Sequence, residues 1–484
     1  MVCTVDLRRY GSFSETVLSG WGSTGNEDYA ARVQVGWLSG DPYENGDGLR
    51  MTEMAAGKSA YLPEVLDAKA YEAWHAGLEF RWRLKDSIQM VANALRREDT
   101  SVLFLGLKMD ADHTRTDQFG LRFEDEASPG YFDQWAVDFY YNETDHLMSD
   151  RRRMTSLMGP GGRGWFMVTD ARSSNFGMTF DAEFETNEYG HWEVGAEFDR
   201  RLWDSDNVIG PNQNEMLPDT MLDTLGAYAE GRFKLSDTRL LELGMRLDRF
   251  AAETNGDTTF LQSLQGSDRN REYIEPGAFI SLRQELGEHS GVFLGLGSIA
   301  RSPNPQELYI QVDKPMAKPD WVGNPDLDAP RSTELTAGWE FARDDLFLRA
   351  RVFHAWLDDY IYPVKVTTPS AFQSYDNIDA RLYGVELKSE YSLAEHWSLG
   401  LALAWQQGEK RSRPNASTND VLAEIPPLRV QGSLNYVDSN TELSLEARAS
   451  AGQGRTDRDL FEQDMAAGLH SRFVAVSNSM IIGR

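Results

Sequence analysis

Strict alternation of apolar and polar residues is the feature that most restricts how this chain can fold. In the segment 397–405, one face of an extended chain reads tryptophan, three leucines and tryptophan, while the other face carries small residues. Residues 192–199, 241–248 and 383–388 also alternate with a period of two. This period belongs to β-strands, in which successive side chains point to opposite faces. The pattern predicts an all-β protein whose strands are apolar on one face and polar on the other.

Aromatic residues bracket the apolar band of segment 397–405, as a lipid-facing barrel strand requires, because indole rings prefer the two membrane interfaces. One such segment could equally belong to the core of a soluble β-sandwich. A dozen in series favour a membrane barrel, because a sandwich would bury the charges of the second face or leave that face wet along its length. The 13 Trp, 18 Tyr and 23 Phe suit a β-protein. No stretch approaches about 18 apolar residues, which excludes a transmembrane helix but not transmembrane strands.

Connections of two sizes separate the alternating segments. The long ones are residues 41–66, 149–174, 201–218, 255–270 and 309–330, and the short ones are residues 235–237, 342–345 and 394–396. Long loops that alternate with tight turns are typical of outer-membrane barrels. No linker or long repeat divides the chain, so we predict one domain of consecutive hairpins. At roughly 22 residues per strand and connection, the 484 residues would form about 20 strands.

Charge and composition exclude several functional classes. The chain has 48 basic and 76 acidic residues, a net charge of −28, so it lacks the basic face of a nucleic-acid binder. The single cysteine, Cys3, excludes a disulfide scaffold and a cysteine-based zinc site. The sequence contains no nucleophile elbow, phosphate-binding loop or zinc-protease motif, and we therefore predict that the protein is not an enzyme.

Several segments of the second half carry a resemblance to a known family. They are residues 300–309 (ARSPNPQELY), 323–327 (GNPDL), 331–335 (RSTEL), 380–387 (ARLYGVEL) and 424–429 (EIPPLR). Their order and spacing resemble the barrel of a TonB-dependent outer-membrane receptor. The resemblance implies a large antiparallel transmembrane β-barrel of the 22-strand type, incomplete and without a plug domain. It also implies a monomeric transporter, surrounded by lipid in the outer membrane of a Gram-negative bacterium and driven by the TonB energy-transducing complex.

The resemblance suggests a division of the chain into three parts. These are an unassigned N-terminal segment 1–30, a receptor barrel 31–456 and an atypical C-terminal segment 457–484. The sequence shows neither a signal peptide nor a plug, and it ends at Arg484 rather than at the aromatic residue usual for such barrels. We interpret these features as those of a fragment or a disrupted gene.

A narrower resemblance lies earlier in the chain. Residues 109–110 (MD), 119–124 (FGLRFE) and 139–148 (FYYNETDHLM) resemble the copper receptors of the same family. Those receptors carry a His-x-Met sequence at this place as part of a copper site, whose other ligands, a Cys and a Met, lie in the plug. The resemblance therefore implies that His146 and Met148 bind copper as cargo, and it implies no organic cofactor.

The chemistry of His146 and Met148 agrees with that implication. The apolar face of residues 135–141 is predicted to contact lipid, which would turn both side chains toward the barrel lumen if no bulge intervenes. An imidazole nitrogen and a thioether sulfur are suitable ligands for Cu(I). Residues 135–148 exceed the roughly 9–11 residues that cross a bilayer, so the end of this strand is predicted to protrude on the extracellular side.

The predicted loop 149–174, which follows this strand, contains methionines and arginines that we expect to have structural roles. We expect Met154, Met158 and Met167 to fill space beneath the loop, and the arginine run 151–153 to be solvated.

Two alternative functions stay open. The first keeps the fold but changes the cargo to a ferric siderophore or another nutrient. The second is a soluble secreted all-β binding protein or enzyme, which extraction as a monomer without detergent would favour.

Overall fold

The computed structural model describes residues 2–10, 13–85, 87–126, 130–187, 190–266, 268–315, 320–366, 372–414, 417–439 and 441–477, with side chains except at residues 2–10, 187 and 472–477. The helices are short and lie in connections. They are α1 (Met51–Met54), α2 (Thr259–Leu264) and α3 (Pro305–Tyr309), with the 3₁₀ turns η1 (Gly57–Ser59), η2 (Pro63–Val65), η3 (Met154–Met158), η4 (Pro160–Gly162) and η5 (Arg458–Leu460). None of the helices in these ranges is long and apolar enough to cross a membrane.

Strands make up the rest of the fold. They are β1 (Val2–Tyr10), β2 (Thr16–Gly25), β3 (Tyr29–Gly40), β4 (Tyr71–Arg83), β5 (Ile88–Val102), β6 (Asp110–Asp125), β7 (Gln134–Ser149), β8 (Met167–Asn187), β9 (Gly190–Ile209), β10 (Asn212–Ser236), β11 (Arg239–Thr254), β12 (Asn270–Glu285), β13 (Ser290–Ala300), β14 (Gln311–Val312), β15 (Asp320–Val322), β16 (Arg331–Arg343), β17 (Leu346–Val366), β18 (Phe372–Ala394), β19 (Trp397–Lys410), β20 (Arg429–Val437), β21 (Thr441–Ser450) and β22 (Gly468–Ser477).

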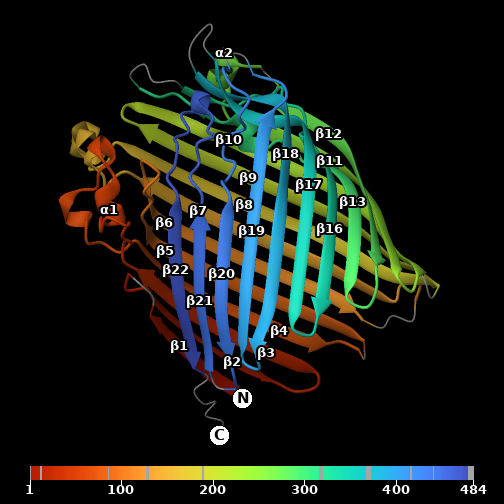
Figure 1. Ribbon diagram of the computed structural model, residues 1–484. Coiled ribbons are helices and arrows are strands. Elements are labelled where there is room, and N and C mark those ends of the chain that lie inside the picture. Colours follow the sequence, from red (N-terminus) through yellow and green to blue (C-terminus); the bar gives the residue numbers. More distant parts are fainter. Residues whose placement is uncertain are drawn as a thin grey trace.

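All 22 described strands belong to one sheet, which curls into a barrel (Figure 1). The short strands β14 and β15 lie in the connection between β13 and β16, and β15 pairs in parallel with β18. Without these two, 20 of the 22 strands form the wall, each antiparallel to the next along the chain. Among the described residues, no pairing joins β1 to β22. The predicted fold class is confirmed, and the described part of the chain contains no separate plug domain.

The two ends of the barrel differ in their connections. Tight turns such as residues 237–238, 344–345 and 395–396 lie at one end, which we name the turn end. The longer connections, with α1 and α2, lie at the opposite loop end, whereas β1 starts and β22 ends at the turn end (Figure 1).

One predicted loop is wrong. Residues 201–218 belong instead to the strands β9 and β10, which pair until residues 209 and 212 and are joined through Gly210, a residue with a φ of +59°. Register shifts between 215 and 217 and between 217 and 220 let the strand continue past Pro218. The asparagines, aspartates and proline in this stretch suit turns as well as a polar hairpin, so composition alone did not reveal the pairing.

The outward face of the barrel carries the predicted apolar band. On β19, the alternate residues Leu399 and Leu401 have 45% and 53% of their side chains exposed, and tryptophans stand at positions 397 and 405. Exposed leucines and valines recur at the same height on neighbouring strands, for example Leu387 on β18. An exposed apolar belt with aromatic borders is a surface suited to lipid.

The segment 1–30, left unassigned from the sequence, contributes β1 and β2 to the wall. Within the segment 457–484, β22 pairs with β21 over its whole described length. Residues 1, 11–12 and 478–484, which include the C-terminal Arg484, lie outside the described residues.

Packed side chains hold the loop end together. Leu261 of α2, Leu308 and Tyr309 of α3, Val322 of β15 and Leu327 are fully buried in one apolar cluster. This cluster connects the loop between β11 and β12 with the loop between β13 and β16, so these two long connections form one compact layer.

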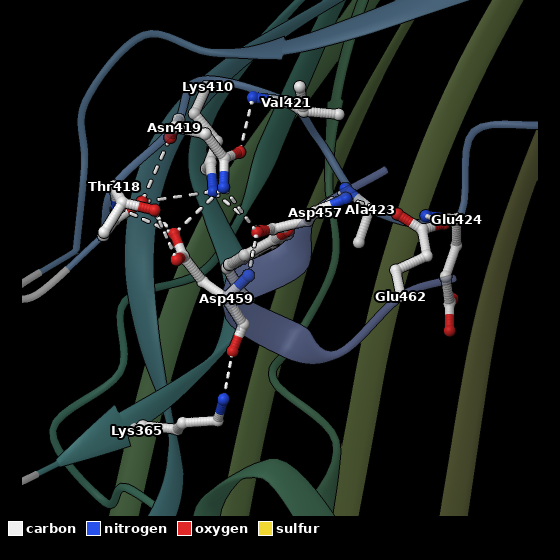
Figure 2. Close-up of polar contacts among 12 residues, drawn as sticks. Lys365, Lys410, Thr418, Asn419, Val421, Ala423, Glu424, Asp457, Asp459 and Glu462 are labelled. Carbon is white, nitrogen blue, oxygen red and sulfur yellow. Dashed lines mark hydrogen bonds and ion pairs between the residues drawn. The ribbon is translucent and has the colours of Figure 1, made fainter. Parts of the chain in front are cut away.

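A buried ion pair and its neighbours join two other connections, residues 411–428 and 451–467, to the strands β17 and β19 (Figure 2). Lys410 Nζ lies 2.7 Å from Asp457 Oδ2, and both side chains are almost fully buried. Asn419 Nδ2 donates to Asp457 Oδ1 at 3.0 Å, and the Tyr362 hydroxyl donates to Oδ2 at 2.5 Å. Burial opposes ionisation of Asp457, but hydrogen bonds from Lys410, Tyr362 and Asn419 outweigh it and hold its pKa below the ordinary value.

A second buried ion pair corrects the interpretation of the arginine run. Arg153 is fully buried, and its guanidinium makes two hydrogen bonds to Asp110, at 2.8 and 2.5 Å. It also donates to the Ser59 and Phe104 carbonyl oxygens and lies 3.7 Å from the Tyr61 ring. These contacts join the loops after β3, β5 and β7, so Arg153 is a structural anchor rather than a solvated charge.

The outward apolar band generates a paired test. Leu401→Arg places a cation at the centre of the band and is expected to lower the free energy of unfolding by about 2–4 kcal/mol. Ala402→Arg is the control, because its side chain points to the polar lumen and is expected to cost much less. Denaturant unfolding in lipid vesicles measures both. Equal losses for the two variants would contradict the assignment of faces.

The Arg153 anchor generates a second test. Arg153→Met leaves Asp110 buried and unpaired, which is expected to destabilise the loop end by about 3–5 kcal/mol. Arg151→Met, whose half-exposed side chain pairs with Asp112 at 3.0 Å, is expected to cost at most about 1 kcal/mol. Hydrogen exchange of residues 57–66 and 103–109 reports the loss. Unchanged exchange in Arg153→Met would show that this residue is not an anchor.

Candidate metal site on the inward face of β7

The strand β7 carries both residues of the predicted metal site. It pairs with β8 without interruption from residue 134 to residue 149, so alternation of faces holds along its whole length. A register shift does occur nearby, but it lies in β6 between Ala111 and His113. His146 and Met148 therefore point to the same face, two residues apart.

The inward face of β7 is identified by its other members. Asp138 Oδ2 accepts a hydrogen bond from Arg122 at 2.6 Å, and the Tyr140 hydroxyl donates to Asp199 at 2.5 Å. The opposite face carries Phe139, which is 43% exposed within the apolar band. Because His146 has the parity of Asp138 and Tyr140, its side chain lies on the lumen side of the wall.

Charges on the outward face show that His146 lies beyond the apolar band. Glu143 accepts hydrogen bonds from Tyr141 and, at 2.6 Å, from Arg172. Asp145 forms an ion pair with Arg115. Carboxylates and guanidinium groups on this face exclude contact with hydrocarbon. The C-terminal part of β7, from residue 143 on, therefore lies beyond the membrane-facing part of the wall, toward the loop end.

The His146 imidazole is half-buried and oriented. Its Nδ1 lies 2.7 Å from the Thr114 Oγ1, in hydrogen-bonding contact across the β6–β7 pair. Burial lowers the pKa of His146, with the nearby Asp99 carboxylate acting in the opposite direction. A lowered pKa keeps the imidazole neutral near pH 7, and the neutral form is the one that coordinates metals.

The neighbours of Met148 are small or polar. Its cross-strand partners are Ala111 on β6 and Thr169 on β8, both buried. Thr169 Oγ1 accepts a hydrogen bond of 2.6 Å from Asn207 Nδ2, whose side chain is buried as well. Neither partner is large enough to cover the thioether, and Met148 is partly exposed.

Together the two side chains offer one nitrogen and one sulfur donor. The described residues contain no group of three or more His, Cys, Asp or Glu side chains that could hold a metal ion. The arrangement is thus a two-donor partial site, and metal binding by His146 and Met148 stays a prediction.

The other methionines nearby differ from expectation. Met154 and Met158 have 39% and 41% of their side chains exposed, so they do not fill space beneath the loop as the sequence suggested. The 3₁₀ turn η3, which follows the anchored Arg153, turns both residues to the surface.

Thr114 was missed from the sequence, because only the β6–β7 register brings it opposite His146.

Comparison with known proteins identifies the barrel. The family model for the TonB dependent receptor-like β-barrel matches residues 21–469. No curated protein matches the chain.

Three solved structures illustrate the likeness. The copper transporter OprC shares 18% identity at a TM-score of 0.80, over 97% of this chain and 73% of its own. The siderophore receptor PirA from Pseudomonas aeruginosa shares 13% identity at a TM-score of 0.63, over 96% of this chain and 71% of its own. The FrpB iron transporter from Neisseria meningitidis (F3-3 variant) shares 12% identity at a TM-score of 0.71, over 96% of this chain and 72% of its own.

At these identities the solved structures show the fold, whereas the family model covers most of the chain. The family consists of receptors and transporters rather than enzymes, and its barrels lie in the outer membrane of Gram-negative bacteria. This chain belongs to the TonB-dependent receptor family, and it forms the β-barrel of that family.

Proposed function

We propose that this chain forms the wall of an outer-membrane receptor that takes up copper, with the TonB complex supplying the energy. The observation that carries the proposal is the placement of His146 and Met148 on one inward face of β7, beyond the apolar band at the loop end. A cargo ion entering from the loop end would meet these donors before it passed the membrane-embedded part of the lumen.

The donor atoms favour copper over hard cations. A thioether sulfur and an imidazole nitrogen suit Cu(I), whereas Mg²⁺ and Ca²⁺ prefer oxygen ligands. Two donors are too few for a complete site, so the remaining ligands would come from outside the wall. The net charge of −28 adds a general attraction for cations around the protein.

Similarity to the copper transporter OprC supports the same cargo. At 18% identity that similarity shows the fold alone, so the cargo assignment rests on the two side chains of β7. We further propose that the protein resides as a monomer in the outer membrane of a Gram-negative bacterium, because the outward band is suited to lipid along the wall.

A ferric siderophore or another nutrient is the second candidate cargo. The similar barrels include the siderophore receptor PirA and the iron transporter FrpB, which have the same architecture. Growth on a siderophore that depends on this protein, together with the absence of Cu(I) binding, would favour this candidate.

The copper proposal predicts the effect of removing either donor. His146→Ala and Met148→Ala are each expected to weaken Cu(I) binding by more than about tenfold. Even the loss of a residue that only hydrogen-bonds to a metal ligand typically lowers metal affinity by about 10–100-fold. Competition with a chromophoric Cu(I) chelator in detergent measures the affinity.

His113→Ala and Met158→Ala are the matched controls. His113 faces outward beside Glu98 at 3.1 Å, and Met158 lies in the exposed turn η3, so neither is expected to change the affinity. The copper proposal would be refuted by unchanged affinity in His146→Ala and Met148→Ala, provided that both variants still fold as barrels.

A further inference from the structure

We infer that Thr114 is a positioning residue for the metal site: it holds the His146 ring so that Nε2, rather than Nδ1, is presented to the cargo ion. This inference deepens the proposed function and rests on it.

The register of the wall brings the two residues together. Thr114 of β6 is the direct cross-strand partner of His146 of β7, so both side chains lie on the inward face. The contact of 2.7 Å between Thr114 Oγ1 and His146 Nδ1 is short enough for a strong neutral hydrogen bond. The residues are 32 positions apart in the chain, so the contact depends on strand pairing and not on local sequence.

The direction of this hydrogen bond decides which ring nitrogen carries the lone pair. A neutral imidazole carries its proton on one nitrogen and a lone pair on the other, and only the lone pair can bind a metal. If Nδ1–H donates to Thr114 Oγ1, the lone pair is on Nε2. Metal-binding histidines commonly donate their second ring N–H to an oxygen acceptor in this way.

The ring of His146 is partly exposed, and its cross-strand neighbour on the free side is small. The Nδ1 contact is directed toward β6, which turns Nε2 away from β6. On β8 the cross-strand partner of His146 is Ala171, whose methyl group cannot cover the ring. Met148 lies two residues along on the same face, so its thioether is on the same side of the wall as the ring.

A neighbouring pair of threonines provides a matched control. Thr116 Oγ1 lies 3.2 Å from Thr144 Oγ1, one step closer to the turn end on the same face. Replacing Thr116 by valine removes a hydroxyl that also bridges β6 and β7, but it leaves the hydrogen bond to His146 Nδ1 in place.

The test compares three variants of the complete protein in detergent. Thr114→Val keeps the side-chain shape but removes the acceptor, Thr114→Ser keeps the hydroxyl, and Thr116→Val is the control. The first readout is Cu(I) affinity by competition with a chelator. The second is the ring-nitrogen NMR signature of His146 without metal, after ¹⁵N-histidine labelling and assignment with His146→Ala.

We expect Thr114→Val to bind Cu(I) about 10–100-fold more weakly, as for other outer partners of metal ligands. Its metal-free NMR spectrum should show His146 shifting away from the form protonated at Nδ1. Thr114→Ser and Thr116→Val should keep both the affinity and the signature of the unmodified protein.

The outcomes separate this inference from the proposed function. Unchanged affinity or an unchanged ring signature in Thr114→Val overturns the positioning role, and so does an equal loss in Thr116→Val. Unchanged affinity in His146→Ala overturns the copper site itself, and the positioning role then falls with it. If Thr114→Val does not form a barrel, Thr114→Ala takes its place with the same two criteria.

Discussion

Continuous hydrogen bonding between neighbouring strands is the constraint on which the rest of this structure depends. In hydrocarbon each unpaired backbone N–H or C=O group costs several kcal/mol, so a spanning sheet must pair every strand. In the described residues, an antiparallel ladder joins each wall strand to the next along the chain, from β1–β2 to β21–β22. Because pairing fixes the register, it also decides which residues of each strand face lipid and which face the lumen. The apolar band and the candidate metal site both follow from that sorting.

The long connections at the loop end require a different source of order, because they lie beyond the apolar band and most of their residues are outside the ladders. Apolar residues of α2 and α3 form one core there, and the buried pairs Arg153–Asp110 and Lys410–Asp457 join other connections. Burying a charge is unfavourable unless hydrogen bonds compensate for lost hydration. Both pairs have such bonds: Arg153 donates to the Tyr61 hydroxyl and the Phe104 carbonyl oxygen, and the Asn419 amide donates to Asp457. These ion pairs fix the connections at the loop end, and the Arg153–Asp110 pair lies directly after β7.

Local patterns in the sequence were sufficient for the class of fold. Alternation at residues 397–405 identified a strand with a lipid-facing side, and the structure exposes Leu399 and Leu401 as that pattern requires. The alternation of β7 likewise put His146 and Met148 on one face, and the uninterrupted pairing with β8 keeps them there.

Features that depend on distant partners could not be predicted in the same way. Arg153 is buried because Asp110, 43 residues earlier, lies opposite it, and nothing in the run 151–153 distinguishes it from its neighbours. Thr114 reaches His146 only through the β6–β7 register, which runs without a shift from the pair 113–147 to the pair 125–135. The β9–β10 hairpin was missed because polar strands above an apolar band have the composition of loops.

We propose that copper binds between His146 and Met148 on the inward face of β7. Anomalous diffraction at the copper edge, from crystals of the complete protein loaded with Cu(I), tests it most directly. We expect a copper peak in bonding contact with His146 Nε2 and Met148 Sδ, with Nδ1 still in contact with Thr114. If the protein binds copper in solution but the crystals show the peak elsewhere and none at β7, His146 and Met148 are not the copper ligands.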